Sequence, residues 1–187
     1  MRRAAGAGLA LLLALAGGCA RPPDPSPGGF SVPAFFEGAS VSKGTVKVAL
    51  VSTTAFTARF EGVRKGSSLV LDERFLFEDG PRLQRWRLTE VSPGVYRGTV
   101  ETQGEGERLA PPVPVEGRAT RDGAVLVYDG IAPGGGGTRL GFRHVMTARP
   151  DGTVSNHVTV SKFGLPIATS AVVFAKTAAA LDAAPPP

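Results

Sequence analysis

One stretch of the chain decides its fold: Ser68-Leu69-Val70-Leu71-Asp72-Glu73-Arg74-Phe75-Leu76-Phe77-Glu78-Asp79-Gly80. Read with a period of two residues, alternate side chains fall on one mostly apolar side of a β-strand: Leu69, Leu71, Glu73, Phe75 and Phe77. The following Gly80-Pro81 predicts a turn, because glycine accepts positive φ and proline cannot continue a strand ladder. The segment from Gln84 to Glu90 then returns with Trp86 and Leu88 on one side. The pattern predicts a long β-hairpin with one carboxylate, Glu73, in its apolar row.

The rest of the chain continues this pattern. From Gly44 to Lys176, short strand-like segments follow one another at hairpin spacing, and turn signals such as Asp122-Gly123 and Gly164-Leu165-Pro166 separate them. No stretch carries the 3.6-residue period of a long helix. About ten sequential strands predict an all-β domain, an antiparallel up-and-down meander that closes into a β-barrel of about eight to ten strands, since closure removes exposed edges. A β-sandwich of two sheets is the alternative.

The N-terminal residues resemble the leader of a bacterial lipoprotein. Met1-Arg2-Arg3 is a short basic start, and the apolar run from Ala4 to Leu15 is too short to span a bilayer stably. The small residues Ala16-Gly17-Gly18 precede Cys19, as in a lipobox, in which the cysteine receives a diacylglyceryl group and becomes the new N-terminus. We therefore expect a signal peptide over residues 1–18 and lipidation of Cys19. Ordinary secretion with cleavage nearby is the alternative.

The single cysteine supports this interpretation. Cys19 has no second cysteine with which to form an intramolecular disulfide. Acyl chains such as palmitate anchor a protein stably, at about 0.8 kcal/mol per buried CH₂. Ala20, rather than aspartate, follows Cys19, and by resemblance to bacterial sorting rules this favours the outer membrane of the cell envelope, with the domain facing the periplasm.

Composition divides the rest of the chain into three parts. Residues 19–29 are rich in proline and predict an extended tether after the lipidated cysteine. Residues 30–176 form the expected barrel domain, and the Ala/Pro-rich residues 177–187 predict a disordered tail beyond about one helical turn.

The charge of the chain is small and mixed. The formal net charge of +5 falls to about +3 once Arg2 and Arg3 leave with the signal peptide, and acidic and basic residues are interleaved. This composition is not typical of nucleic-acid binding, so we expect a membrane partner, through the lipid anchor, and no nucleic acid. A surplus of this size is compatible with weak attraction to an anionic membrane surface.

Three polar residues, Glu73, His144 and Asn156, lie in rows that are otherwise apolar. A buried carboxylate or imidazole must find a partner or shift its pKa, so together these residues could orient a ligand inside the barrel. The alternative is that each is satisfied by backbone groups or water. Aromatic side chains of the same rows are expected to line or plug the interior: Phe56, Phe60, Phe75, Phe77, Trp86 and Phe142.

The usual catalytic patterns are missing from the sequence. After lipidation no thiol remains, and there is neither a Gly-x-Ser-x-Gly elbow nor a phosphate-binding loop. His144 and His157 are predicted to face opposite sides of neighbouring strands, which argues against a shared zinc site. We therefore expect no catalytic residues, no metal and no cofactor.

Several short motifs, in order and spacing, resemble a family of proteobacterial lipoproteins known as domain of unknown function number 3833. The similarity extends from Phe35 to Lys176 and rests on these segments: Phe35-Phe36-Glu37-Gly38, Leu71 to Gly80, Gln84-Arg85-Trp86, and Val160-Ser161-Lys162-Phe163-Gly164. The resemblance implies a lipocalin-like barrel and no established activity. The family tends to carry paired acids followed by Trp after a Phe, where this chain reads Phe142-Arg143-His144-Val145, so no role of such a pair transfers.

Three functional hypotheses follow. The first is an outer-membrane lipoprotein, not an enzyme, whose barrel binds an apolar or lipid-like small molecule, with Glu73 and His144 as polar anchors. The second is an envelope structural or partner-binding module with a filled barrel. The third is an enzyme acting on modified acyl chains, which the resemblance suggests because members of the family lie near genes for modifying membrane fatty acids.

Overall fold

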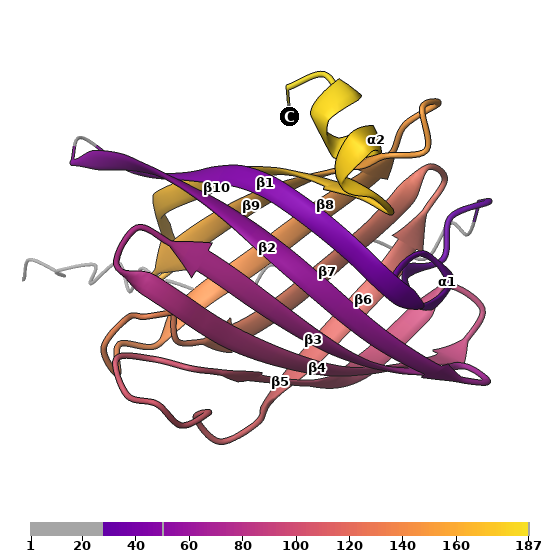
Figure 1. Cartoon of the computed structure of the whole chain (residues 1–187). Helices are drawn as coiled ribbons and strands as arrows, with labels where there is room; N and C mark the ends of the chain where they lie inside the picture. The colour runs from indigo at the N-terminus through magenta and orange to yellow at the C-terminus, as the bar shows by residue number, and fades with distance from the viewer. Residues whose placement is uncertain (1–27, 50, 187) are drawn as a thin grey trace, which may run out of the picture.

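The computed structural model describes residues 28–49 and 51–186, and within them ten antiparallel strands close into one barrel (Figure 1). Each strand pairs with its neighbours in sequence, and β1 pairs with β10 to complete the closure. The all-β, up-and-down barrel predicted from the sequence is therefore confirmed, and the sandwich is excluded. The elements are α1 (Val32–Phe35), β1 (Gly38–Val48), β2 (Ser52–Lys65), β3 (Ser68–Phe77), β4 (Gly80–Ser92), β5 (Val95–Thr102), β6 (Val113–Thr120), β7 (Gly123–Gly130), β8 (Leu140–Ala148), β9 (Val154–Lys162), β10 (Leu165–Ala175) and α2 (Ala178–Ala183).

The central hairpin is formed by β3 and β4. Leu71 pairs with Trp86 and Phe77 with Gly80, whose φ of 122° provides the turn that glycine permits. Along β3 the predicted inward row is buried at Leu69, Leu71, Glu73 and Phe75, while the side chains between them are more exposed. The period-two pattern therefore gives both the hairpin and the side of the strand that faces the interior.

One end of the barrel is closed by the chain that precedes β1. Helix α1 begins after Ser31, whose Oγ accepts from Ala34 N at 3.5 Å, and Val32 and Phe36 are buried. A Cβ on Gly62 would lie 1.8 Å from the carbonyl oxygen of Phe36, so a glycine in β2 permits this close approach. The loops β2–β3, β4–β5, β6–β7 and β8–β9 lie at this end, and the other hairpin turns lie at the opposite end (Figure 1).

The C-terminal residues pack against the barrel. Thr177 caps α2, since its Oγ1 accepts from Ala180 N at 3.2 Å, and Leu181 is buried against Val173 and Ala175 of β10. This helix takes the place of the short helical turn that the sequence allows at the start of residues 177–187, and one cap and one buried leucine hold it beside the strand. Disorder of the remaining tail stays a prediction. None of the described helices is long and apolar enough to cross a bilayer.

One turn lies earlier than the sequence indicates. The pattern predicts a turn at Gly164-Leu165-Pro166, whereas the structure pairs Lys162 with Leu165 and places the turn at Phe163-Gly164. The predicted signal peptide, Cys19 and most of the tether lie outside the described residues.

Candidate functional site

Aromatic rings fill much of the barrel interior. Toward the α1 end, Phe36, Phe60 and Phe174 pack with ring centroids 5.3–5.5 Å apart. A second cluster, nearer the opposite end, is formed by Phe56, Phe75 and Phe77, with centroids 5.3–5.6 Å apart. Contacts at these distances are those of close-packed rings, so the two clusters occupy the interior rather than surround a space.

The hydrogen-bonded pair Glu73 and Trp86 lies between these clusters. Trp86 of β4 donates from Nε1 to Oε2 of Glu73 on β3, at 3.1 Å. The Trp86 ring also meets Tyr128 and His144 edge-on, with centroids 5.4 and 5.7 Å away. Tyr128 stacks in turn on Phe142 at 4.8 Å. Strands β3, β4, β7 and β8 therefore each contribute a side chain to one interior layer.

His144 and Asn156 meet across strands β8 and β9. Their atoms Nδ1 and Nδ2 lie 3.3 Å apart, so the amide donates to His144 when Nδ1 carries no proton. The proton then resides on Nε2 of His144, and this atom and Oδ1 of Asn156 are buried without a partner among the described residues. Unpaired buried polar atoms cost about 1–3 kcal/mol each, which indicates that water or a ligand group completes this pair.

These side chains line a small cavity of about 40 Å³. Its polar lining comes from Glu73, Trp86, His144 and Asn156, and the apolar lining from Phe36, Phe60, Leu88, Leu126, Met146 and Phe174. One water needs roughly 10–15 Å³ of such space, whereas sites for drug-sized ligands measure about 300–1,000 Å³. The cavity therefore suits one or a few water molecules and is too small for an acyl chain.

Burial sets the protonation of the interior groups. Loss of hydration raises the pKa of Glu73 to about 8, against the opposing effect of the Trp86 N–H, and lowers the pKa of His144 to about 4. Burial also raises the pKa of the Tyr128 hydroxyl above its ordinary value. Near pH 7 the site thus holds a protonated carboxyl group and a neutral imidazole. It carries no charge that would attract an ion.

Gln84, Thr102 and Tyr128 are interior polar residues that were not identified from the sequence. Gln84 donates from Nε2 to Thr102 Oγ1 at 2.8 Å and lies 3.5 Å from the Tyr128 hydroxyl. Gln84 shares the inward row of β4 with Trp86 and Leu88, so the alternation already indicated its side of the strand. That Tyr128 meets it from β7 follows only from barrel closure.

The structure separates the sequence-predicted site residues into two groups. Glu73, His144, Asn156, Trp86 and Phe60 share the cavity. Phe56, Phe75 and Phe77 form their own cluster, and Phe142 contacts Tyr128 instead. His157 is exposed on the outer face, as its row predicts. In the described part of the chain, no group of three or more His, Cys, Asp or Glu side chains is placed to hold a metal ion.

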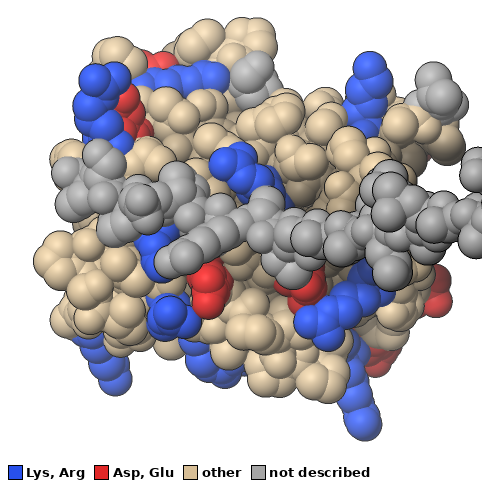
Figure 2. All heavy atoms as spheres, turned by 180° about the vertical axis from the view of Figure 1, so that it is seen from behind, with Lys and Arg blue, Asp and Glu red and all other residues tan. Residues whose placement is uncertain are grey.

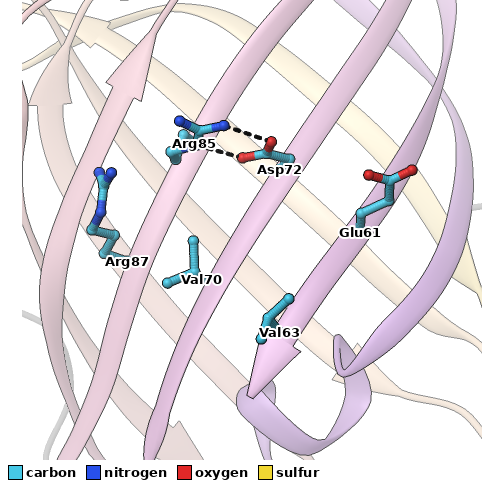
Figure 3. A pocket seen from close by; sticks show the side chains of 6 residues that line it. All are labelled: Glu61, Val63, Val70, Asp72, Arg85 and Arg87. Atoms are coloured by element: carbon cyan, nitrogen blue, oxygen red, sulfur yellow. Dashed lines mark hydrogen bonds and ion pairs between the residues drawn. The ribbon is translucent and has the colours of Figure 1, made fainter. Parts of the chain in front are cut away.

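A shallow groove of about 230 Å³ lies on the outer face of β2, β3 and β4 (Figure 3). Asp72 accepts from Arg85 Nε and Nη2 at 2.6 and 2.8 Å, and this pairing lowers the pKa of Asp72 below its ordinary value. Val63 and Val70 provide its exposed apolar surface, and Glu61 and Arg87 complete the lining. The lining holds two acidic residues, Glu61 and Asp72, and two basic residues, Arg85 and Arg87, so the groove carries no net charge.

Sequence comparison gives one result that bears on the site. A family described as protein of unknown function (DUF3833) matches residues 23–176, which include every strand of the barrel. The chain belongs to this family. The match spans Glu73, Trp86, His144 and Asn156, but the family description assigns them no role. No curated protein sequence matches the chain.

Proposed function

We propose that this chain is a lipoprotein of the bacterial outer membrane, anchored through Cys19, whose filled barrel acts through its outer surface as a structural or partner-binding module. The observation that carries this proposal is the interior packing. Two triads of phenylalanine rings and the Trp86–Tyr128–Phe142 contacts occupy the barrel, and the cavity between them measures about 40 Å³. A carrier of an acyl chain needs an interior several times larger.

A binding measurement tests the filled interior. The mature chain, beginning at residue 19 with Cys19→Ser, is titrated with a fluorescent fatty acid at micromolar concentration and examined by native mass spectrometry. We expect the bare polypeptide and no saturable binding. Saturable binding in one-to-one ratio, with a bound lipid in the mass spectrum, would contradict the filled-barrel proposal.

A cavity-creating variant gives a second test of the filled interior. Phe60→Ala removes one ring beside the existing cavity, and engineered apolar cavities of about 150 Å³ bind benzene. We therefore expect benzene to raise the melting temperature of Phe60→Ala and to leave that of the wild type unchanged.

The lipid anchor needs its own experiment, because Cys19 lies outside the described residues. Cells that express the full chain are grown with a labelled fatty acid, and the protein is isolated. We expect label on the wild type and none on Cys19→Ala. A label that survives this substitution, or a wild type without label, would contradict lipidation of Cys19.

One observation favours a second candidate, binding of a small lipid-like molecule inside the barrel. His144 Nε2 and Asn156 Oδ1 have no hydrogen-bond partner in the part of the chain that the structure describes, and the protonated Glu73 can donate a hydrogen bond to a ligand. Such a ligand requires Phe36 or Phe60 to move out of the cavity. The candidate predicts that the fatty-acid binding described above occurs and is weakened at least tenfold in Asn156→Leu, which removes the amide at similar size.

A further inference from the structure

We propose that two neighbouring hairpin turns form a docking surface for an anionic lipid bilayer. These are the β1–β2 turn, of which the structure describes Val48, Ala49 and Val51, and the β9–β10 turn at residues 162–165, here called the hairpin tips. The proposal goes beyond the proposed function, because it is a second membrane contact that does not depend on Cys19. It rests on four observations. The two turns are neighbours, and their large apolar side chains are exposed. Phe163 occupies a backbone position that disfavours it, and lysines flank both turns.

The hairpin tips lie side by side at the end of the barrel opposite α1. Val48 of β1 pairs with Ala168 of β10, and Ala49 N donates to the carbonyl oxygen of Ile167 at 3.1 Å. The β1–β2 turn and α1 are at opposite ends of the molecule in Figure 1. A flat surface can therefore meet both tips at once.

Large apolar side chains are concentrated at the tips. Phe163 is 94% exposed, Val51 78% and Leu165 70%. With Val48, they make up four of the eight large apolar side chains exposed on the described part of the chain. Single exposed apolar residues are ordinary, but a cluster at the tips of two adjacent turns indicates an interaction surface.

Phe163 occupies a backbone position that disfavours it. Phe163 and Gly164 have φ of 53° and 79°, the two positive values of a type I′ turn, and Phe163 is the only non-glycine residue with positive φ among those described. Asn or Gly is preferred there, since a bulky side chain at positive φ costs roughly 1–2 kcal/mol. A strained phenylalanine that is 94% exposed buries almost no apolar surface in the fold, which favours a use outside the fold.

The strands that carry the tips have basic side chains and no acidic ones beside the two turns. Lys47 and Lys162 flank the two turns, with Lys162 Nζ 5.7 Å from the centre of the Phe163 ring. Residues 38–60 and 152–181, which include β1, β9 and β10, contain no aspartate or glutamate. The face in Figure 2 instead shows basic and acidic side chains together. Apolar tips flanked by lysines suit the headgroup and acyl boundary of an anionic bilayer.

The proposed anchor can reach the same membrane. Gly28, where the described chain begins, is nine positions after Cys19, and a chain of that length spans at most about 30 Å when extended. Strands β1, β9 and β10, which reach the tips, have 11, 9 and 11 residues, and because barrel strands are tilted to the axis they span about this height. The barrel can therefore rest its tips on the bilayer that holds the acylated cysteine.

Vesicle co-sedimentation tests the proposal, with the chain from residue 19 carrying Cys19→Ser so that no acyl anchor contributes. The vesicles contain phosphatidylcholine alone or with a minority of phosphatidylglycerol. We expect binding to the anionic vesicles that weakens at high salt. Phe163→Asn with Leu165→Thr should bind about tenfold more weakly, and Lys47→Glu with Lys162→Glu about tenfold or more.

The tip variant is chosen to fold, because asparagine suits the type I′ position. Val91→Thr is the matched control: Val91 is 53% exposed but lies beside the β4–β5 turn at the α1 end, so its loss should leave vesicle binding unchanged. The proposal is overturned if the unaltered chain does not bind anionic vesicles. It is equally overturned if the tip variant binds like the unaltered chain, if Val91→Thr reduces binding as much, or if the chain sediments without vesicles because it associates with itself.

Discussion

The two ends of the barrel treat apolar side chains in opposite ways. At the α1 end, Val32 and Phe36 are 1% and 2% exposed, and the chain's own N-terminal segment covers the interior. At the opposite end, Phe163 and Leu165 of the hairpin tips extend into solvent, and the backbone of Phe163 is strained by its positive φ. At the α1 end, burial of apolar side chains stabilises the fold. At the opposite end, apolar side chains remain exposed although their burial would be favourable, which indicates a role outside folding.

The largest change in the free energy of unfolding should come from a substitution at the α1 end. Phe36→Ala removes a ring that contacts both Phe60 and Phe174, so we expect the free energy of unfolding to fall by about 3–5 kcal/mol. Urea denaturation measures it. The same change at the hairpin tips, Phe163→Ala, should alter the free energy of unfolding by no more than about 0.5 kcal/mol, as for other exposed sites. Equal losses at both positions would end the distinction between the two ends.

The two ionisable groups of the cavity, Glu73 and His144, should make the free energy of unfolding depend on pH. Glu73 keeps its proton up to about pH 8 in the folded chain but ionises near 4.5 when unfolded, so its contribution falls as pH rises between these values. His144 stays neutral down to about pH 4 but protonates near 6.5 when unfolded, so its contribution rises with pH over that range. The two cancel between about pH 4.5 and 6.5, and a net fall of about 2 kcal/mol remains between 6.5 and 8.

Glu73→Gln isolates this contribution, because glutamine can still accept from Trp86 but does not ionise. Denaturation at several pH values should show that the variant lacks the loss of stability between pH 6.5 and 8. A wild type whose stability is unchanged over that range, or a variant that retains the loss, would show that Glu73 is not held protonated by burial.

A smaller effect is expected where the closing segment is attached to the barrel. Lys176 donates from Nζ to the carbonyl oxygens of Phe35 and Glu37, at 2.9 and 2.8 Å. Lys176→Met keeps the length of the side chain but loses both hydrogen bonds, which should lower the free energy of unfolding by about 1 kcal/mol. Hydrogen exchange of the amides in residues 32–37 should also become faster. Unchanged exchange there would mean that the lysine does not hold the segment.

The smallest effect has the opposite sign. Phe163→Asn places a favoured residue at positive φ and removes an exposed ring, so we expect the free energy of unfolding to rise by about 0.5–1 kcal/mol. Thermal denaturation measures the gain. A loss of stability would show that Phe163 makes contacts that support the fold, and its exposure would then need no external partner.

The sequence predicted the barrel well because its signals are local. Alternation along β3 and β4 identifies the inward rows, and a hairpin needs only a turn between two such rows. The same alternation placed Glu73, Trp86, His144 and Asn156 on the inner side, where they line the cavity. It did not show that side chains from β3 and β8 meet, because that depends on the closure of all ten strands.

Features that depend on only a few residues could not be predicted from the sequence. Helix α1 has four residues and α2 six, too short for a helical period to appear. The turn at Phe163-Gly164 was missed because phenylalanine is not a turn residue by preference. The size of the cavity depends on how rings from different strands interlock, which no period in the sequence records.

The central claim is that the interior is closed and the chain works through its outer surface. It is tested most directly by following one ¹⁵N-labelled sample of the chain from residue 19, with Cys19→Ser, as anionic bicelles are added. Trp86 is the only tryptophan, so its indole N–H reports the interior through a single signal. We predict shifts at the amides of Phe163, Gly164 and Leu165 and none at the Trp86 indole. A shift of the indole signal, with the tip amides unchanged, would contradict the account.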